Sequence, residues 1–477
     1  MTPSPLFVAA AILLASPFAA PAFAQSAGLS DADRRAGAQA HPQLVSQFGG
    51  AMSGPQADYV RRIGQKIAVQ SDPSTRPQDY TVTLLNSNAN NAFAIPGGYV
   101  YITRQLLALM DDEAELAFVL GHEVGHVAAR HGQKRQTRAA LSGILAGLAG
   151  AVTGSQMVGQ GANMLAQVTT LGYSREQERQ ADSLGVRYLT RANYDPMASG
   201  DILAALGAQT SLEGRLSGKG DGQPAKWLST HPSTPERVRR ILAEAKIASA
   251  NAGARATNRD AFLDAIDGMV VDDDPSQGTV EGRSFRHSGI GVAFDAPQGF
   301  VLQNGTEAVT GTSGNGARFQ FAGGGGKGED FAAYSARIWR QAGAQPGALS
   351  AQRINGLEVA VSRAAGGSGG RPVDAVLAVY RWGPDSYYHI LGLAPQGGAP
   401  AFDPLIGSVR RMAAGNDSRA RTRRVSVVRV AKGDTVQSLA ARMAYDDDKI
   451  ARFTVLNHVD ANARLEPGRR VKLIVLR

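Results

Sequence analysis

The sequence predicts a multidomain protein: a mainly α domain with a small sheet, then an α+β domain on an antiparallel sheet, then a compact C-terminal module. The first indication is length, because 477 residues exceed one ordinary domain. The second is helical periodicity over residues 30–260, interrupted by a short strand region near 80–103. The third is a change, over residues 283–412, to short runs of alternating apolar and polar residues separated by Gly-rich turns.

Residues 1–24 predict a cleaved secretory signal peptide. They carry no charged side chain, and an apolar run leads to a small-x-small sequence at residues 22–24. An uncleaved anchor is the alternative, because the segment lacks a basic start. The chain has no cysteine, which excludes disulfides, a lipidated cysteine and cysteine-ligated metals. We therefore expect a protein of the bacterial periplasm, either free or peripheral to a membrane.

The net charge of +9 is concentrated at the C-terminus. Residues 419–477 hold 14 Lys and Arg against 6 Asp and Glu, a balance of +8, which leaves about +1 for the rest of the chain. A polar, basic linker at residues 413–424 leads into the compact module at 425–477. Such a basic module predicts an anionic partner, either cell-wall polymer (peptidoglycan) or an anionic membrane surface. Secretion argues against nucleic acid.

Residues 139–174 contain no charged side chain and are long enough to cross a membrane. The stretch is interrupted by Gly, Ser, Gln, Thr and Asn, and its bulky apolar residues are sparse. We interpret it as a helical hairpin that covers a cleft or dips into a membrane surface, with a true transmembrane span as the alternative.

One helix is predicted over residues 111–131. Acidic residues at 111–113 favour a helix N-terminus, an apolar-periodic run follows, and Gly132 provides a stop. His131 lies nine residues beyond His122, and on a continuous helix it faces away from that residue.

The motif HEVGH, residues 122–126, predicts a zinc site on this helix. His122 and His126 lie at i and i+4, so both imidazoles can reach one zinc ion at about 2.0–2.1 Å. Glu123 is rotated by about 100° from His122 and can approach a water on that ion. Gly121 and Gly125 keep the helix slim, so that another element can pack close. The chain holds only eight histidines, so an accidental match is rare.

A catalytic zinc ion with two histidines needs a third protein ligand and an open position. The charged segment YSREQERQAD, residues 173–182, offers Glu178. Taken alone, Glu178 is more typical of a solvated surface charge. Asp182 lies one turn further along the same face, where it can accept a hydrogen bond from a ligating imidazole and fix its tautomer.

HEVGH followed by this ExxAD segment resembles the zinc metallopeptidases of the HtpX, BepA and CAAX-protease type. The segments NAFAIPGGYVYIT at 91–103, NYDPMA at 193–198 and HPSTPERVRRI at 231–241 resemble family motifs in the same order. The resemblance covers roughly residues 40–245. It implies a zincin-like fold and a metallopeptidase of the soluble, secreted type.

The resemblance also implies roles for single residues. His122, His126 and Glu178 would bind one Zn²⁺ per chain, and Glu123 would be the general base that deprotonates the zinc-bound water. His231 and Arg237 would line the cleft as catalytic residues, with His231 donating to the oxyanion. Alternatively, His231 caps the zinc as a reversible inhibitory ligand, or it merely precedes a helix.

The strand at residues 91–103 is also a candidate site for substrate binding. An exposed sheet edge can pair with an extended substrate, and this mode recognises backbone rather than sequence. The predicted substrate-binding residues are Asn91, Phe93 and Ile95. Pro96 and the glycines after it would end the pairing.

The two downstream parts carry no catalytic constellation. Residues 283–412 predict a substrate- or partner-binding domain. In the last part, GDT before a helix, LN near the middle and PG before a closing strand resemble the LysM fold. The resemblance implies a small βααβ module that binds N-acetylglucosamine polymers. The charged middle, AYDDDKIARF, departs from that pattern and leaves a small structural cap as the alternative.

The sequence thus predicts a zinc-dependent endopeptidase that degrades misfolded or mis-assembled envelope proteins. The rival hypothesis is an autoinhibited chaperone or assembly factor for envelope proteins, with a plugged zinc site. A glycan-binding protein with a decayed peptidase is disfavoured, because every expected site residue is present.

Overall fold

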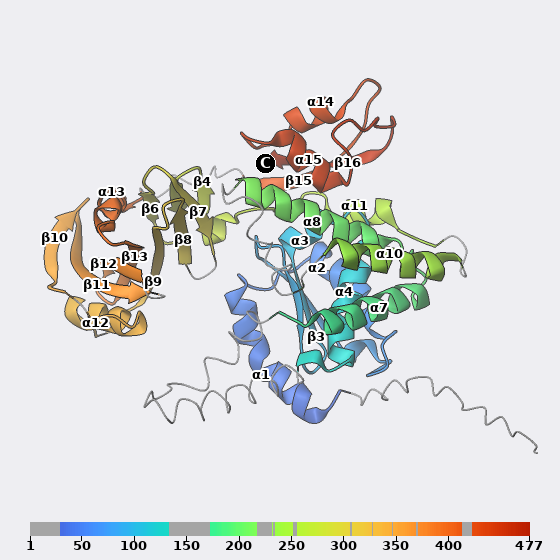
Figure 1. Ribbon diagram of the computed structural model, residues 1–477, viewed down its shortest axis with the longest axis horizontal. Coiled ribbons are helices and arrows are strands. Elements are labelled where there is room, and N and C mark those ends of the chain that lie inside the picture. The colour runs from blue at the N-terminus through green and yellow to red at the C-terminus, as the bar shows by residue number, and fades with distance from the viewer. Residues whose placement is uncertain are drawn as a thin grey trace, which may run out of the picture.

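A computed structural model describes residues 29–132, 172–216, 231, 234–250, 255–305, 308–326, 328–345, 347–368, 371–412 and 422–477. The predicted signal peptide, most of the uncharged stretch 139–174 and linker residues 413–421 lie outside these ranges. Figure 1 shows three parts: a helical domain (residues 29–266), a sheet domain beside it (279–412) and a C-terminal module (422–477) above it. Among the described residues, no helix is both long and apolar enough to cross a membrane.

The helical domain packs its helices around one three-stranded sheet. Strand β3 lies in the middle, parallel to β1 and antiparallel to β2, so β2 is an edge strand. The strands are β1 (Thr81–Leu85), β2 (Ala92–Ile95) and β3 (Tyr99–Thr103). The helices are α1 (Asp31–Gln47), α2 (Pro55–Ala68), α3 (Arg104–Leu109), α4 (Glu113–Ala128), α7 (Arg175–Arg191), α8 (Ala198–Leu216), α10 (Pro235–Ala250) and α11 (Arg259–Ile266).

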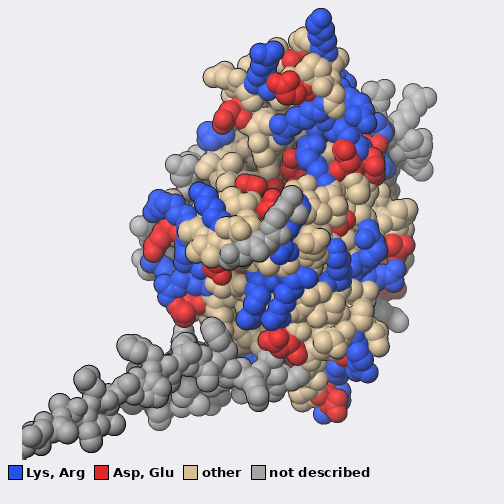
Figure 2. Space-filling view, turned by 90° about the vertical axis from the view of Figure 1, so that its right-hand side faces the viewer, with Lys and Arg blue, Asp and Glu red and all other residues tan. Residues whose placement is uncertain are grey.

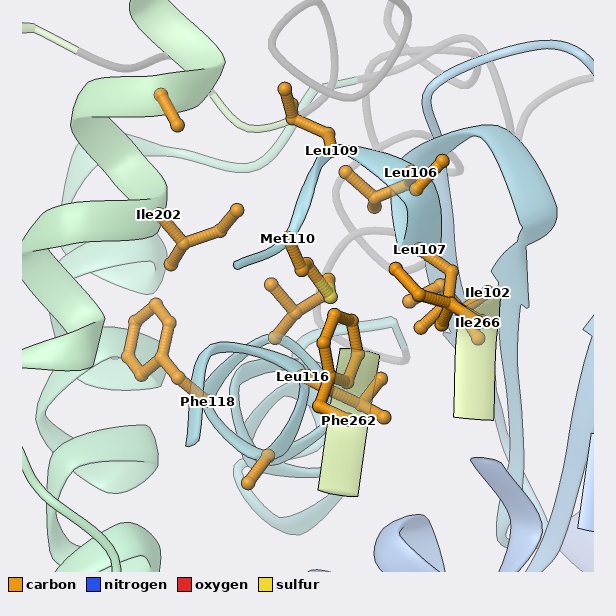
Figure 3. Packing of buried hydrophobic residues seen from close by; sticks show 14 of the residues in the cluster. Ile102, Leu106, Leu107, Leu109, Met110, Leu116, Phe118, Ile202, Phe262 and Ile266 are labelled. Carbon is orange, nitrogen blue, oxygen red and sulfur yellow. The ribbon is translucent and has the colours of Figure 1, made fainter. Parts of the chain in front are cut away.

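Helix α4 is the central helix of this domain, and every residue from Glu113 to His126 is buried. The Asp112 side chain accepts a hydrogen bond from the Glu115 backbone N–H and so caps the helix. Apolar residues of α3, α8 and α11 pack around the first turns of α4 (Figure 3). Our prediction of one helix through His131 was wrong at its end: α4 stops at Ala128, and Arg130 has a φ of 54°.

Helices α4 and α7 approach closely through glycines, as predicted for Gly125. A Cβ atom there would lie 3.2 Å from the Cβ of Leu184 and 3.3 Å from the carbonyl oxygen of Ala181. A Cβ on Gly185 of α7 would lie 2.9 Å from the Phe118 ring of α4. The two helices that carry the predicted metal ligands are therefore pressed together with no room for larger residues.

The sheet domain contains antiparallel sheets, as the alternating pattern predicted. A seven-stranded sheet has the order β10-β11-β12-β13-β9-β8-β7, a second sheet has the order β14-β6-β5-β4, and aromatic and aliphatic residues fill the space between them. Helix α12 (Phe331–Gln341) packs on the larger sheet through Tyr334 and Trp339. The strands are β4 (Thr279–Glu281), β5 (Ser284–His287), β6 (Val292–Asp295), β7 (Phe300–Asn304), β8 (Ala308–Ser313), β9 (Arg318–Gly325), β10 (Ser350–Ile354), β11 (Leu357–Ser368), β12 (Arg371–Gly383), β13 (Ser386–Pro395) and β14 (Arg410–Arg411), and a short helix α13 spans Asp403–Ser408.

The C-terminal module has the predicted βααβ order. Its strands β15 (Arg423–Arg429) and β16 (Arg470–Leu476) pair antiparallel, with α14 (Val436–Ala441) and α15 (Lys449–Asn457) between them. Its apolar residues belong to the same buried cluster as those of the helical domain. Strand β15 also bonds to the chain just after α11, where the Val425 N–H donates to the Met269 carbonyl. The module is therefore built onto the helical domain and is not a separate body on a tether.

Much of the basic surplus of the module is used inside the chain. The ammonium of Lys472 is fully buried and donates to the carbonyls of Ala108, Leu109 and Met110 at the end of α3. Arg470 pairs with Asp264 on α11 at 2.5 Å. The structure thus gives Lys472 backbone carbonyls and Arg470 a carboxylate as internal partners, and an external glycan or lipid partner stays a prediction.

His458 joins the module to the first turn of α4. Its Nε2 lies 3.0 Å from the Leu109 carbonyl oxygen, and its Nδ1 lies 3.2 Å from a carboxylate oxygen of Glu115. Both ring nitrogens therefore face acceptors, which favours the doubly protonated ring. Burial lowers the pKa of His458, but the Glu115 carboxylate outweighs burial and raises it above 6.5.

This raised pKa predicts a pH-dependent stability. The folded state keeps the His458 proton longer than the unfolded state, so its contribution is complete below pH 6.5 and is lost as pH rises through the folded pKa. Lys472, whose pKa is lowered to about 8 by burial, acts in the opposite direction only above that pH. We expect the thermal midpoint to fall between pH 6.5 and 8, and the fall to be smaller in His458→Gln. An equal fall in both proteins would contradict the assignment.

Candidate metal centre

Four buried side chains from three segments converge on one point. Their ligand atoms all lie within 4.8 Å of one another. Helix α4 supplies His122 and His126, whose Nε2 atoms are 3.0 Å apart. Helix α7 supplies Glu178, and the chain before α10 supplies His231. The structure thus brings together the three predicted ligands and also the residue whose role the sequence left open.

The spacing of these atoms fits a metal ion. Four tetrahedral ligands at about 2.0–2.2 Å from zinc stand about 3.3–3.6 Å apart. The Nδ1 of His231 lies 3.2 Å from the Nε2 of His122 and 3.0 Å from Oε1 of Glu178, and the Nε2 of His126 lies 3.5 Å from that oxygen. Three imidazoles and one carboxylate are also a donor set that suits zinc. The residues present therefore fit the predicted ion.

Asp182 lies beside His122, where it was expected to fix the tautomer of that ring. Its Oδ1 lies 3.1 Å from the Nδ1 of His122, on the side of the ring away from the cluster. The guanidinium of Arg237 donates to both oxygens of Asp182, at 2.7 and 2.9 Å, and Arg240 donates to it at 2.8 Å. Burial raises the pKa of Asp182, but His122 and Arg237 lower it far more, so the carboxylate stays ionised.

Arg237 serves this network and also lines a cavity between α7 and α10. Besides Asp182, it pairs with Oε2 of Glu178 at 2.7 Å and donates to the backbone carbonyl of His231 at 3.2 Å. The guanidinium of Arg237 thus holds Asp182, Glu178 and the backbone of His231 together. The structure gives Arg237 a positioning role, and direct contact with a reacting group stays a prediction.

His131 was misplaced by sequence reasoning. It is fully buried, and its Nδ1 lies 2.8 Å from the Nδ1 of His126. We expected it to face away, because we extended the helix through it. The left-handed turn at Arg130 instead brings it back beneath His126. The Oε1 of Gln180 on α7 lies 3.0 Å from the Nε2 of His131, and the side chain of Gln177 donates to the His131 carbonyl.

These contacts favour one pair of tautomers. With Gln180 accepting through Oε1, the Nε2 of His131 carries a proton and its Nδ1 offers a lone pair. That lone pair accepts from Nδ1–H of His126, which leaves the Nε2 lone pair of His126 free to face the cluster. Burial lowers the pKa of His126 well below 6.5, so the ring is neutral and able to ligate. His122 is thus backed by a carboxylate and His126 by a neutral imidazole.

Two further residues border the cluster. Tyr173, just before α7, stacks on His126 with ring centroids 3.7 Å apart and 18° between the planes. Sequence reasoning missed it, because a tyrosine beside a charged helix gives no signal of its own. Glu123 is fully buried next to its predicted partners, and its Oε1 lies 3.6 Å from the Nε2 of His231.

Two of the predicted substrate-binding side chains belong to a separate apolar cluster. Phe93 and Ile95 of β2 are buried in a small apolar cluster that α1 covers through Leu44. Phe93 stacks on Tyr101 with ring centroids 4.7 Å apart. Asn91 is also buried, and its backbone bonds to Thr103. These side chains therefore support the sheet, and addition of a substrate to the β2 backbone edge stays a prediction.

Comparison with known proteins identifies this domain. Residues 55–245 match the family model described as Peptidase family M48. This segment is a peptidase family M48 domain. It contains all four residues of the cluster, so the resemblance inferred from HEVGH and the ExxAD segment is confirmed.

Curated relatives of the M48 domain are named as proteases. The chain is 29% identical over 224 residues to the mitochondrial metalloendopeptidase OMA1 of Schizosaccharomyces pombe, covering 46% of this chain and 63% of the relative. It is 29% identical over 191 residues to the beta-barrel assembly-enhancing protease of Yersinia pestis, covering 38% and 37%. It is 33% identical over 168 residues to OMA1 of Arabidopsis thaliana, covering 35% and 32%. The chain thus spans from about a third to less than two thirds of these relatives' length.

The hydrogen bonds that link Gln180, His131 and His126 predict a role for His131 in metal affinity. His131→Phe keeps the ring shape but removes the acceptor, so zinc should bind about 10- to 100-fold more weakly. His131→Asn, which restores an acceptor, should recover part of the loss. Competition with a fluorescent chelator would measure both affinities, and the thermal midpoint of the metal-free protein would control for folding. Unchanged affinity in His131→Phe would contradict the role.

Proposed function

We propose that the protein is a zinc-dependent endopeptidase that degrades misfolded or mis-assembled cell-envelope proteins. The observation that carries this proposal is the buried cluster of three histidines and Glu178 in an M48 domain, with Glu123 beside it. Zinc bound by these ligands would lower the pKa of a water molecule and polarise the scissile carbonyl.

The residues of the chain divide the remaining tasks. Glu123 accepts the proton of the attacking water and passes it to the leaving amine. Asp182 and His131 keep the two α4 imidazoles in the ligating tautomer, and Arg237 holds the carboxylates in place. The edge strand β2 is the proposed binding site for the substrate backbone.

The substrate class and the compartment are proposals that rest on two supports. Relatives that match this chain include a beta-barrel assembly-enhancing protease, whose name links it to the assembly of β-barrels. The uncharged, apolar residues 1–24 predict export. We therefore propose a periplasmic protease that acts on unfolded envelope proteins.

A second candidate function is favoured by the position of His231. A catalytic zinc site keeps one coordination position open, whereas structural sites are closed by four protein ligands. His231 lies within ligand distance of His122 and Glu178, where it would close the fourth position. The resting protein would then be autoinhibited, and a protein that stayed in this state would act as a chaperone or assembly factor. On this reading His231 would leave before a peptide is cut.

Digestion of casein by the purified, zinc-loaded chain tests the principal proposal. We expect cleavage that a chelator abolishes and that zinc restores. Glu123→Gln should retain zinc but lose at least about 100-fold in rate, because it lacks the general base. Glu176→Gln, an exposed glutamate on α7, is the matched control and should keep the parental rate. Equal cleavage by Glu123→Gln and the parent would refute the proposal.

His231→Ala separates a cap from a catalytic role. If His231 closes the fourth position, its removal should raise the initial rate of casein cleavage, and zinc should bind more weakly. If it stabilises the oxyanion, the rate should fall by about 100-fold with zinc affinity unchanged. We expect the first result, because His231 lies within ligand distance of Glu178 and His122.

A further inference from the structure

A cavity of about 230 Å³ lies directly beside the metal cluster. It opens between α7 and α10, and Glu178 forms part of its wall. The described residues that line it are Arg175, Glu178, Arg179, Thr234, Glu236, Arg237 and Arg240. Four of these seven residues are arginines, and the volume is sufficient for an amino-acid side chain.

Both helices point their N-termini toward this cavity. Contacts between them advance in the same direction along each chain: Glu178 meets Arg237, Asp182 meets Arg240, and Ser183 meets Glu244. Helices α7 and α10 therefore run parallel, with 17 and 16 residues, and the positive ends of their dipoles lie together. Two helix N-termini reinforce the field of the arginines.

Not all of the guanidinium donors are used. Arg237 and Arg240 are paired with Asp182, but the Nε of Arg240 is buried and, among the described residues, has no hydrogen-bond partner. Arg179 pairs with Glu176 at the exposed surface, where such pairs contribute little. Arg175 has no ion pair with a described residue. Figure 2 shows lysine and arginine side chains spread widely over one face of the molecule, with aspartate and glutamate among them.

Two carboxylates line the cavity and oppose this field. Glu178 is turned toward His231 and Arg237, so its charge is already compensated within the cluster. Glu236 is exposed in the first turn of α10. The donors that remain match the planar, two-oxygen geometry of a carboxylate.

We propose that this cavity is a subsite for a substrate carboxylate next to the scissile bond. The subsite rests on the proposed peptidase function, because Glu178 is shared between its wall and the metal cluster. A peptide whose carbonyl lies at the cluster brings a neighbouring residue within one side-chain length of the cavity. The carboxylate comes either from an internal Asp or Glu side chain or from the C-terminus of the substrate.

Matched peptide pairs distinguish these sources. One quenched fluorescent pair carries Glu or Gln beside the cleavage site, and a second ends in a free carboxylate or an amide at the same distance. The full zinc-loaded chain should cleave the favoured acidic member about 10-fold faster in kcat/KM, and added salt should reduce the difference. Equal rates within both pairs would overturn the subsite while leaving the peptidase function intact. Failure to cleave casein would instead count against the peptidase function.

Variants assign any preference to this cavity. The double variant Arg175→Gln with Arg179→Gln should lose the preference, with little change for the Gln or amide peptides. Arg239→Gln is the matched control, because Arg239 is exposed on α10 and does not line the cavity. A preference that survives the double variant, or that Arg239→Gln also removes, would overturn the assignment.

Binding gives a readout that does not need turnover. Fluorescence anisotropy on the Glu123→Gln background should show tighter binding of the acidic peptides, and the double arginine substitution should abolish the difference. Equal binding of acidic and neutral peptides to this background would overturn the subsite.

Discussion

The close packing of α4 against α7 is the constraint on which the candidate site depends. Two imidazoles on α4 can share an ion with Glu178 on α7 only if the helix backbones almost touch. Gly125 and Gly185 allow this approach, because a Cβ at either position would meet the other helix at 3.2 Å or less. Larger residues there would push α4 and α7 apart and so separate the ligands on one helix from the ligand on the other. These glycines therefore affect metal binding as well as packing.

The charge network behind the ligands follows from the same packing. Once α7 lies against α4, Asp182 is buried and needs compensation, which His122 and two arginines of α10 provide. Helix α10 is thereby fixed in register with α7, and His231 just before it is placed among the ligands. The mutual hydrogen bonds of these charges offset the cost of removing them from water, and loss of one partner would leave a buried charge uncompensated.

Sequence reasoning predicted what depends on local spacing. The i, i+4 spacing placed His122 and His126 on one face, and the ExxAD pattern supplied Glu178 and Asp182. It failed for His131, because a single residue in the left-handed region, Arg130, reverses the chain after α4. A left-handed backbone conformation at a non-glycine residue cannot be recognised from the periodicity of apolar residues.

Long-range docking was also beyond a reading of local patterns. The C-terminal module was predicted as a basic, partner-binding unit, yet Lys472 is buried beneath it against the end of α3. Phe93 and Ile95 were predicted to bind substrate from an edge-strand pattern. Their side chains pack with Leu44 of α1, and substrate pairing with the β2 backbone stays a prediction. A sequence shows which side chains are charged or apolar. It does not show which distant segment of the chain will bury an apolar side chain or pair with a charged one.

X-ray absorption at the zinc edge tests the central claim most directly, since it reports the ligands of a bound ion in the full-length protein. The account predicts one zinc ion per chain, with three imidazole nitrogens and one carboxylate oxygen at about 2.0–2.1 Å. In His231→Ala one imidazole should be lost and the other ligands should remain. A protein that binds no zinc, or a spectrum with no imidazole scattering, would contradict the account.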